Sequence, residues 1–209
     1  MSAVVDRRVL RRTAGRLLFG AGLEETAGHV SLEGAGVAHA DSVRYAASPW
    51  WVLRWLLPRS AVRPSDVFVE LGCGKGRVVL DAARRYPFRR VVGVELAPAL
   101  SEVARALVER ERDGLRCRDV RIETTDATEF AIPDDMTHAY LYNPFNGATF
   151  ERVCANVVAS LDRAPRTVRV MYLHAADHAT LTATGRFRLV RRVRTTRLVH
   201  ESAAIYEAS

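Results

Sequence analysis

Short apolar runs alternate along the chain with longer segments in which apolar residues recur at helical spacing. Residues 67–71 form an apolar run broken only by Glu70, which predicts a strand buried on both faces of a sheet. Apolar residues within 78–83 predict a helix directly after it. The same succession returns, with strands expected at 90–96, 120–125, 137–142 and 167–173, and helices at 99–112, 148–161 and 177–184. Strands that alternate with helices indicate an α/β protein with a mainly parallel sheet.

The segment before the first strand has a different pattern. Residues 4–19 predict an amphipathic helix, and residues 20–42, rich in Gly and Ala, predict either a substrate lid or a linker. A short helix is expected at 50–57, with Ser48 as its cap. Its aromatic residues are expected in the core: Trp50, Trp51 and Trp55.

The end of the chain alternates apolar and polar positions. Residues 187–193 and 198–206 therefore predict a final antiparallel hairpin. At 209 residues the chain is long enough for one domain with a real core. We expect residues 61–209 to form the main fold and residues 1–60 to form a helical extension or lid of the same domain.

Three glycines spaced two residues apart follow the first predicted strand. Gly72, Gly74 and Gly76 lie between that strand and the next helix, where a sharp turn and a close ligand leave no room for a Cβ atom. The amides of the following helix offer donors and a partial positive charge. A dinucleotide fingerprint would require a glycine at position 77, where this chain has Arg77. The spacing therefore excludes the NAD pattern and leaves another nucleotide-type ligand or an ordinary structural turn.

Glu95 ends the second predicted strand, beyond the glycine loop. A carboxylate at the partly exposed tip of this strand is placed to accept hydrogen bonds from the two hydroxyl groups of a ribose. A lone Glu at a strand end is usually only solvated, but the preceding loop favours the ligand role. Asp126 follows the third predicted strand, where an Asp is also a common turn residue.

The segment Glu70-Leu71-Gly72-Cys73-Gly74-Lys75-Gly76 resembles the first motif of class I S-adenosylmethionine-dependent methyltransferases. ELGCGKGRVVLDAA followed by VVGVEL is most similar to a group that includes protein-lysine methyltransferases, which have DLGSGxGRVVLxAA. This chain departs from that pattern at Cys73 and Lys75, and it has YNPF where many amino-group methyltransferases have [DN]PP[FY]. The resemblance implies a Rossmann-like, doubly wound, seven-stranded sheet, mostly parallel, with an antiparallel C-terminal hairpin.

The resemblance also implies a cofactor, S-adenosyl-L-methionine, with S-adenosyl-L-homocysteine as its product. An acid after the third strand, with the neighbouring backbone amide, commonly reads the adenine edge in this family, and Asp126 and Ala127 stand there. The segment that follows the fourth strand occupies the place of the family's methyl-transfer floor. The predicted cofactor-binding residues are Glu70, Gly72, Gly74, Gly76, Glu95, Asp126, Ala127 and Asn143.

The predicted chemistry is a displacement at a sulfonium methyl, for which the protein supplies alignment and a water-free site. For a neutral amine acceptor, the carbonyls and amide of Asn143-Pro144 would accept its hydrogens. For a hydroxyl acceptor, His174 or His178 would serve as general base, although either is also consistent with a polar rim residue. The predicted catalytic residues are Asn143, Tyr142 and His174, and the predicted substrate residues are Tyr45, Trp50, Phe145 and His178.

Composition narrows the remaining classes. Cys73, Cys117 and Cys154 lie far apart without a CxxC pair, which argues against a disulfide framework or zinc site and favours a reducing cytoplasm. We recognise no metal constellation, membrane-length apolar run or targeting signal. The net charge is +7, but thirty of the 31 basic residues are arginines scattered along the chain, which indicates GC-rich, bacterial-type coding rather than a nucleic-acid surface.

Three functions remain from the sequence. A methyltransferase that acts on the nitrogen or oxygen of a small molecule or peptide is favoured, because little of the chain is left over for holding a macromolecule. A protein-lysine N-methyltransferase is the alternative, since the glycine motif resembles that group. A partner protein that binds S-adenosylmethionine without transferring the methyl group is the alternative of another class.

Overall fold

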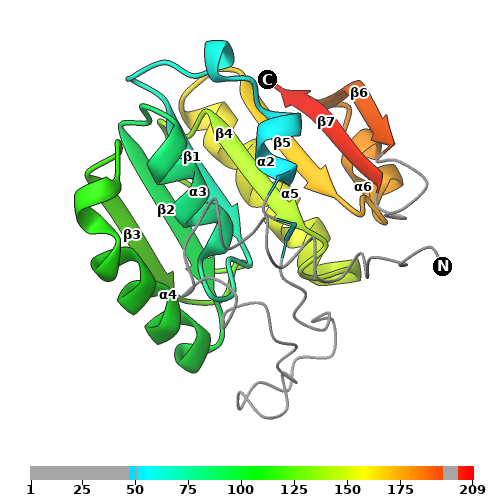
Figure 1. Ribbon diagram of the computed structural model, residues 1–209. Helices are drawn as coiled ribbons and strands as arrows, with labels where there is room; N and C mark the ends of the chain where they lie inside the picture. The colour runs from blue at the N-terminus through cyan, green and yellow to red at the C-terminus, as the bar shows by residue number, and fades with distance from the viewer. Residues whose placement is uncertain (1–47, 50, 195–201) are drawn as a thin grey trace, which may run out of the picture.

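The computed structural model describes residues 48–49, 51–194 and 202–209, which are drawn in colour in Figure 1. The sequence predictions that fall outside these residues are the helix at 4–19, the stretch 20–42, Tyr45 and Trp50.

Strands and helices alternate along the described chain, as the hydrophobic pattern predicts. The strands are β1 Val67–Leu71, β2 Arg90–Glu95, β3 Asp119–Thr124, β4 His138–Tyr142, β5 Val168–Leu173, β6 Phe187–Arg194 and β7 Ser202–Ala208. The α-helices are α2 Val52–Leu56, α3 Arg77–Arg85, α4 Pro98–Arg110, α5 Gly147–Arg163 and α6 His178–Ala183. Short 3-10 turns stand at Arg59–Ala61 and Arg112–Gly114.

The strands form one seven-stranded sheet in the order β3-β2-β1-β4-β5-β7-β6. Strands β1 to β5 pair in parallel, whereas β7 lies between β5 and β6 and is antiparallel to both. The expected mixed sheet with an antiparallel C-terminal hairpin is confirmed. Strand β1 pairs with β2 on one side and β4 on the other, so the chain reverses its direction of winding there. Ligands of open α/β sheets bind at the carboxyl ends of strands beside such a reversal.

Helices cover both faces of the sheet, because successive side chains of a strand point to opposite faces. Phe68 of β1 packs on the face that carries α2, α3 and α4, and its neighbour Val69 packs on the face that carries α5 and α6. All five residues of β1 are buried, which explains why its sequence is almost continuously apolar. Figure 1 shows α2, α3 and α4 on the near side of the sheet.

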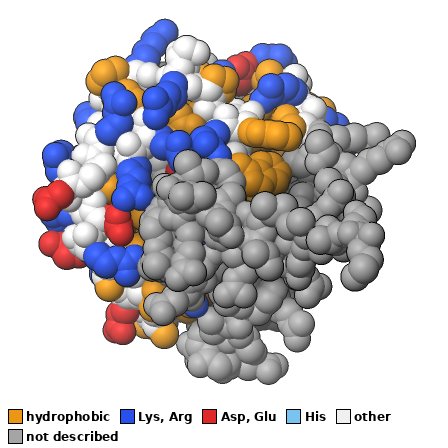
Figure 2. All heavy atoms as spheres, in the orientation of Figure 1, with side chains coloured by type: hydrophobic (Ala, Val, Ile, Leu, Met, Phe, Trp, Pro, Cys, Tyr) orange, Lys and Arg blue, Asp and Glu red, His pale blue; other side chains and the backbone are white. Residues whose placement is uncertain are grey.

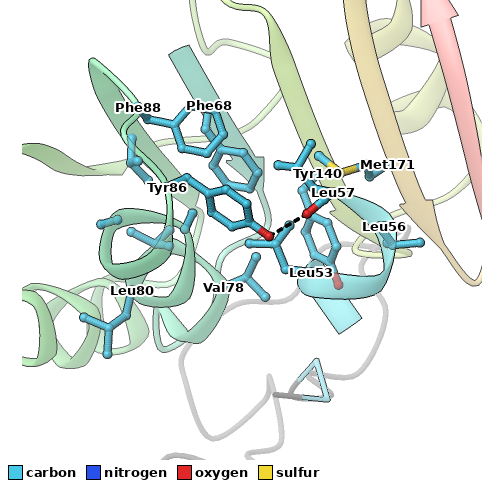
Figure 3. Packing of buried hydrophobic residues seen from close by; sticks show 14 of the residues in the cluster. Leu53, Leu56, Leu57, Phe68, Val78, Leu80, Tyr86, Phe88, Tyr140 and Met171 are labelled. Carbon is cyan, nitrogen blue, oxygen red and sulfur yellow. Dashed lines mark hydrogen bonds between the residues drawn. The ribbon is translucent and has the colours of Figure 1, made fainter. Parts of the chain in front are cut away.

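The first of these cores holds α2 against α3. Leu53 and Leu57 pack beside Tyr86, whose hydroxyl donates to the Leu57 carbonyl at 2.7 Å (Figure 3). One tryptophan prediction is wrong, since Trp55 is 48% exposed instead of lying in the core. Val52, Leu53 and Leu56 fill the inner face of α2, and Trp51 and Trp55 pack against each other with their rings tilted by 54° and centroids 5.0 Å apart.

Arginine side chains are spread over the surface instead of gathering in one patch. On the described part of the face shown in Figure 2, basic side chains stand apart and acidic ones lie between them. Several arginines pair with carboxylates, among them Arg84 with Glu111 and Arg163 with Asp134.

His138 begins β4 in the core, against the ring of Phe88 at a centroid distance of 5.3 Å. Burial lowers the pKa of this imidazole to about 4, although nearby Asp66 acts in the opposite direction. The unfolded chain, in which a histidine titrates near 6.5, therefore binds more protons than the folded protein between the two pKa values. The free energy of unfolding accordingly falls as the pH falls through this window.

We expect His138→Gln to reduce the acid sensitivity of the fold. A shift of this size corresponds to a loss of about 2 kcal/mol of stability between pH 7 and pH 5. Buried carboxylates such as Glu95 have raised pKa values, so they make the fold more stable as the pH falls. They are present in both the wild-type protein and His138→Gln, so their effect cancels in the comparison. Urea unfolding at the two pH values measures the effect. Equal pH slopes in both proteins would contradict it.

Candidate functional site

The predicted site residues meet at the carboxyl edge of the sheet. The glycine loop follows β1, Glu95 ends β2, Asn143 follows β4 and His174 follows β5. The four strands are neighbours in the sheet, so their ends form one continuous edge.

The glycine loop turns through left-handed backbone at each of its glycines. The φ angles of Gly72, Gly74 and Gly76 are 78°, 54° and 76°, a region that residues with a Cβ atom rarely adopt. The backbone amides of Gly72 and Cys73 both donate to the Val94 carbonyl at 2.9 Å, which fastens the loop to the end of β2. A Cβ atom on Gly72 would stand 2.4 Å from Pro144 Cβ. The glycine loop therefore lies directly against the segment after β4.

Glu95 connects the loop to the start of α4. One carboxylate oxygen accepts a hydrogen bond from the Gly74 amide at 2.8 Å, and the other accepts from the Ala97 amide at 2.9 Å. The sequence places Glu95 at a partly exposed strand tip, but this side chain is buried, at 8% exposure, because the loop folds over it. Burial raises the pKa of the carboxyl group, and the Ala97 and Gly74 amides partly oppose that rise. The Leu96 amide also contributes to holding the carboxylate, and a carboxylate with three such donors still has a lone pair for a ligand hydroxyl.

Glu70 lies behind the loop. One of its oxygens accepts a hydrogen bond from the Val79 amide at 3.0 Å, which holds α3 against β1. Burial raises the pKa of this carboxyl group well above its usual value, and Glu95 adds to the rise. Burial also raises the pKa of the Cys73 thiol, with both glutamates adding to it, so the thiol stays neutral. A nucleophilic role for Cys73 therefore has no support.

The turn after β3 is held by Asp126. One carboxylate oxygen accepts from both the amide and the hydroxyl of Thr128, each at 2.7 Å, as in an Asx turn. Asn156 of α5 donates to the Thr128 carbonyl at 2.7 Å and ties this turn to the rest of the fold. The structure thus gives Asp126 a turn role, and the adenine-reading role of Asp126 and Ala127 stays a prediction.

A stacked aromatic pair lies at the carboxyl ends of β4 and β5. The rings of Tyr142 and His174 are nearly parallel, at 11°, with centroids 5.4 Å apart. Asn143 and His174 have φ angles of 41° and 52°, and they are the only non-glycine residues in the described part of the chain with positive φ. Because Tyr142 pairs with Leu173 in the sheet, the two strained residues follow neighbouring strand positions. Clustered backbone strain of this kind marks functional sites.

Two predicted substrate residues have other partners in the structure. Phe145 is 7% exposed and packs with Phe150 in the core, which leaves little of its ring for a ligand. The Nδ1 atom of His178 lies 2.7 Å from the Tyr206 hydroxyl. Their substrate roles stay predictions.

Sequence reasoning missed Tyr172, Asn146 and Asp177, which join the segments after β4 and β5. The Tyr172 hydroxyl donates to Asn143 Oδ1 at 3.1 Å. In the amide orientation that satisfies both its oxygen and nitrogen, Asn146 donates to Asn143 Oδ1 at 2.9 Å and Asp177 Oδ2 at 3.2 Å. A tyrosine inside an apolar strand has the sequence signature of a packing residue, so only the fold identifies this group.

Within the described residues, no cluster of three or more His, Cys, Asp or Glu side chains is arranged to hold a metal ion. None of the helices in that part of the chain is both long and apolar enough to cross a membrane.

The fold is Rossmann-like, and the predicted site residues that the structure describes lie where open α/β sheets bind ligands. Residues 68–166, just under half of the chain, match the family described as "Methyltransferase domain". This segment is similar to a methyltransferase domain, and the resemblance to class I methyltransferases noted in the sequence is confirmed.

A protein-lysine N-methyltransferase of Saccharolobus islandicus is 30% identical over 82 residues, which are 39% of this chain. The match spans only half, 50%, of that relative's length.

Two crystal structures share the fold. An RNA methyltransferase from Salinibacter ruber, in complex with S-adenosyl-L-homocysteine, has a TM-score of 0.58 at 22% identity, over 78% of this chain and 94% of that one. Geranyl diphosphate C-methyltransferase from Streptomyces coelicolor A3(2), in complex with Mg²⁺, geranyl diphosphate and S-adenosyl-L-homocysteine, has a TM-score of 0.56 at 14% identity. That likeness covers 77% of this chain and 78% of the other.

Proposed function

We propose that this protein is an S-adenosylmethionine-dependent methyltransferase that acts on the nitrogen or oxygen of a small molecule or peptide. The observation that carries the proposal is the buried Glu95 carboxylate, held by the Gly74 amide at the reversal point of a methyltransferase sheet. The solved relatives that contain S-adenosyl-L-homocysteine support the same cofactor.

The donors and acceptors of the site fit this cofactor. Glu95 offers the free lone pairs of an ionised carboxylate to a ribose hydroxyl pair, and its backbone hydrogen bonds fix their direction. The left-handed glycines keep side chains away from a ligand that approaches the loop. Asp126 and Ala127 stand at the end of the neighbouring strand, where they would contact the adenine. Glu70 supports the loop from behind.

The bound cofactor would supply an electrophilic methyl group, and the residues of the chain would align the acceptor. Tyr142 and His174 form a flat aromatic wall beside Asn143, against which an acceptor would lie. With an amine acceptor, the wall and the backbone carbonyls of Asn143-Pro144 suffice, provided that the amine arrives neutral. With a hydroxyl acceptor, His174 would remove the proton.

A protein lysine is the second candidate acceptor, favoured by the name of the Saccharolobus islandicus relative. A nucleic acid is less favoured, because the arginines are scattered and several are paired with acids. The three cysteines are free and buried, which suits the reducing cytoplasm that we propose as the location.

Calorimetry followed by methyl-transfer assays tests the proposal. S-adenosylmethionine and S-adenosylhomocysteine are expected to bind, and NAD is expected not to bind. Transfer of a labelled methyl group to pooled metabolites, peptides or lysate proteins then separates the candidate acceptors. Cofactor binding without transfer to any acceptor pool would favour the non-catalytic partner protein. NAD binding with no response to either adenosyl compound would refute the proposal.

A further inference from the structure

Tyr172 of β5 connects the two segments that form the acceptor side of the site. Its side chain is fully buried, and its ring stacks on Phe150 at a centroid distance of 5.2 Å. The phenol oxygen accepts a hydrogen bond from the Asp177 backbone amide, while the phenol hydrogen goes to Asn143 Oδ1 at 3.1 Å. Burial raises the pKa of the phenol, so it remains protonated and keeps the role of donor to Asn143.

This hydrogen bond decides which end of the Asn143 amide faces the site. The Oδ1 atom receives the Tyr172 hydroxyl and the Asn146 amide, and an amide oxygen has two lone pairs. Both are then occupied by protein donors. No residue of the described chain accepts a hydrogen bond from Asn143 Nδ2, so this NH₂ group is left for a ligand. The amide therefore presents donors, which suit a ligand oxygen, and not the acceptor expected from the sequence.

The backbone around the amide needs such a restraint. Asn143 and His174 both have left-handed φ angles, which are unfavourable for residues with a Cβ atom and persist only where the surroundings hold them. The Tyr172 phenol bonds to Asn143 itself and to the segment that carries His174 and Asp177. A single buried hydroxyl thus fixes both segments relative to each other.

We propose that Tyr172 is a positioning residue, which locks the Asn143 amide with its oxygen inward so that its NH₂ group meets an oxygen of the acceptor. The inference rests on the proposed function, since it deepens the description of the same site. Tyr172 itself is covered by the core and does not touch the ligand.

Tyr172→Phe tests the inference, because it removes the hydroxyl and keeps the ring against Phe150. We expect kcat to fall by about ten-fold while KM for S-adenosylmethionine stays within about three-fold. Tyr86→Phe is the matched control, since it also removes one buried phenol hydrogen bond, to the Leu57 carbonyl, away from the strand ends. We expect the control to lose similar stability and to keep its kcat.

A double-mutant cycle separates positioning from general destabilisation. If Tyr172 acts through Asn143, Tyr172→Phe causes no further loss of kcat in an Asn143→Ala background. If its role is only structural, the two losses multiply, which would overturn the inference. A wild-type kcat for Tyr172→Phe would also overturn it.

The side-chain NH₂ signals of Asn143 in an amide NMR spectrum give a readout that does not depend on turnover. We expect Tyr172→Phe to shift them and Tyr86→Phe to leave them in place, with Asn143→Ala providing the assignment. Unchanged signals in Tyr172→Phe refute the locking. If Tyr172→Phe shifts the signals but the wild-type protein binds neither adenosyl compound, the proposed function is refuted and the locking still holds.

Discussion

Replacing Gly72 by alanine is expected to abolish cofactor binding. The new methyl group would stand 2.4 Å from Pro144 Cβ, whereas two such carbons normally rest about 3.5–4.0 Å apart. The glycine loop and the segment after β4 must therefore separate by about 1 Å, and a displacement of that size, which lowers reaction rates by about 100-fold, also spoils the fit of the loop to a ligand; we take about 100-fold as the scale of the loss. We expect affinity for S-adenosylhomocysteine, measured by calorimetry, to fall at least that far.

Gly185→Ala is the matched control for this prediction. Gly185 also has a left-handed φ angle, 69° against 78° for Gly72, but a Cβ atom there meets nothing within 4 Å. The control should lose only the roughly 1–2 kcal/mol of left-handed strain, while Gly72→Ala adds about 1–3 kcal/mol of overpacking. If the two variants are equally stable and both bind cofactor, the contact between the two segments is not required.

The sequence predicts the elements that depend on local hydrophobic pattern. Strand β1, for example, runs from Val67 to Leu71 as its apolar residues predict. A strand that is buried on both faces needs apolar residues at nearly every position. The sequence also predicts the antiparallel hairpin, but its local pattern does not show that β7 lies between β5 and β6.

Site residues could be predicted from the sequence where a backbone conformation strongly favours one residue type. Left-handed turns favour glycine, and positive φ angles are observed at all three glycines of the loop. Phe145 and Tyr172 show the opposite case, since both are aromatic residues near strand ends. Phe145 turns into the core, while Tyr172 places a hydroxyl under Asn143. The local sequence does not tell which of the two side chains packs in the core only and which also bonds to the site. The packing of α5 against the sheet determines this.

The geometry also explains why the site needs rigid neighbours more than reactive groups. Methyl transfer from a sulfonium requires alignment of two groups, and alignment depends on where the segments after β1, β2, β4 and β5 lie. Backbone amides hold Glu95 on one side, and the Tyr172 phenol holds Asn143 on the other. Gly72 and Pro144 join the two sides in direct contact.

Replacing Glu95 by alanine is expected to weaken cofactor binding without altering the sheet. Charge-assisted hydrogen bonds to a ribose contribute on the order of 1.5–3 kcal/mol, so affinity for S-adenosylhomocysteine should fall by about 10- to 150-fold. The change leaves the amides of Gly74 and Ala97 without partners, but it also removes the cost of a buried charge. Affinity is therefore compared only between variants that circular dichroism shows to be folded.

The pH dependence of binding identifies the charge of Glu95 as the cause. Because burial raises its pKa, this carboxyl group becomes protonated at a higher pH than an exposed glutamate and then no longer offers a charged acceptor. Wild-type affinity should accordingly fall as the pH falls through that raised pKa, while Glu95→Gln, already neutral, should bind weakly at every pH. Glu123→Ala, which removes an exposed carboxylate from the neighbouring strand β3, is the control and should behave as wild type. Wild-type affinity in a folded Glu95→Ala protein would refute the ribose assignment.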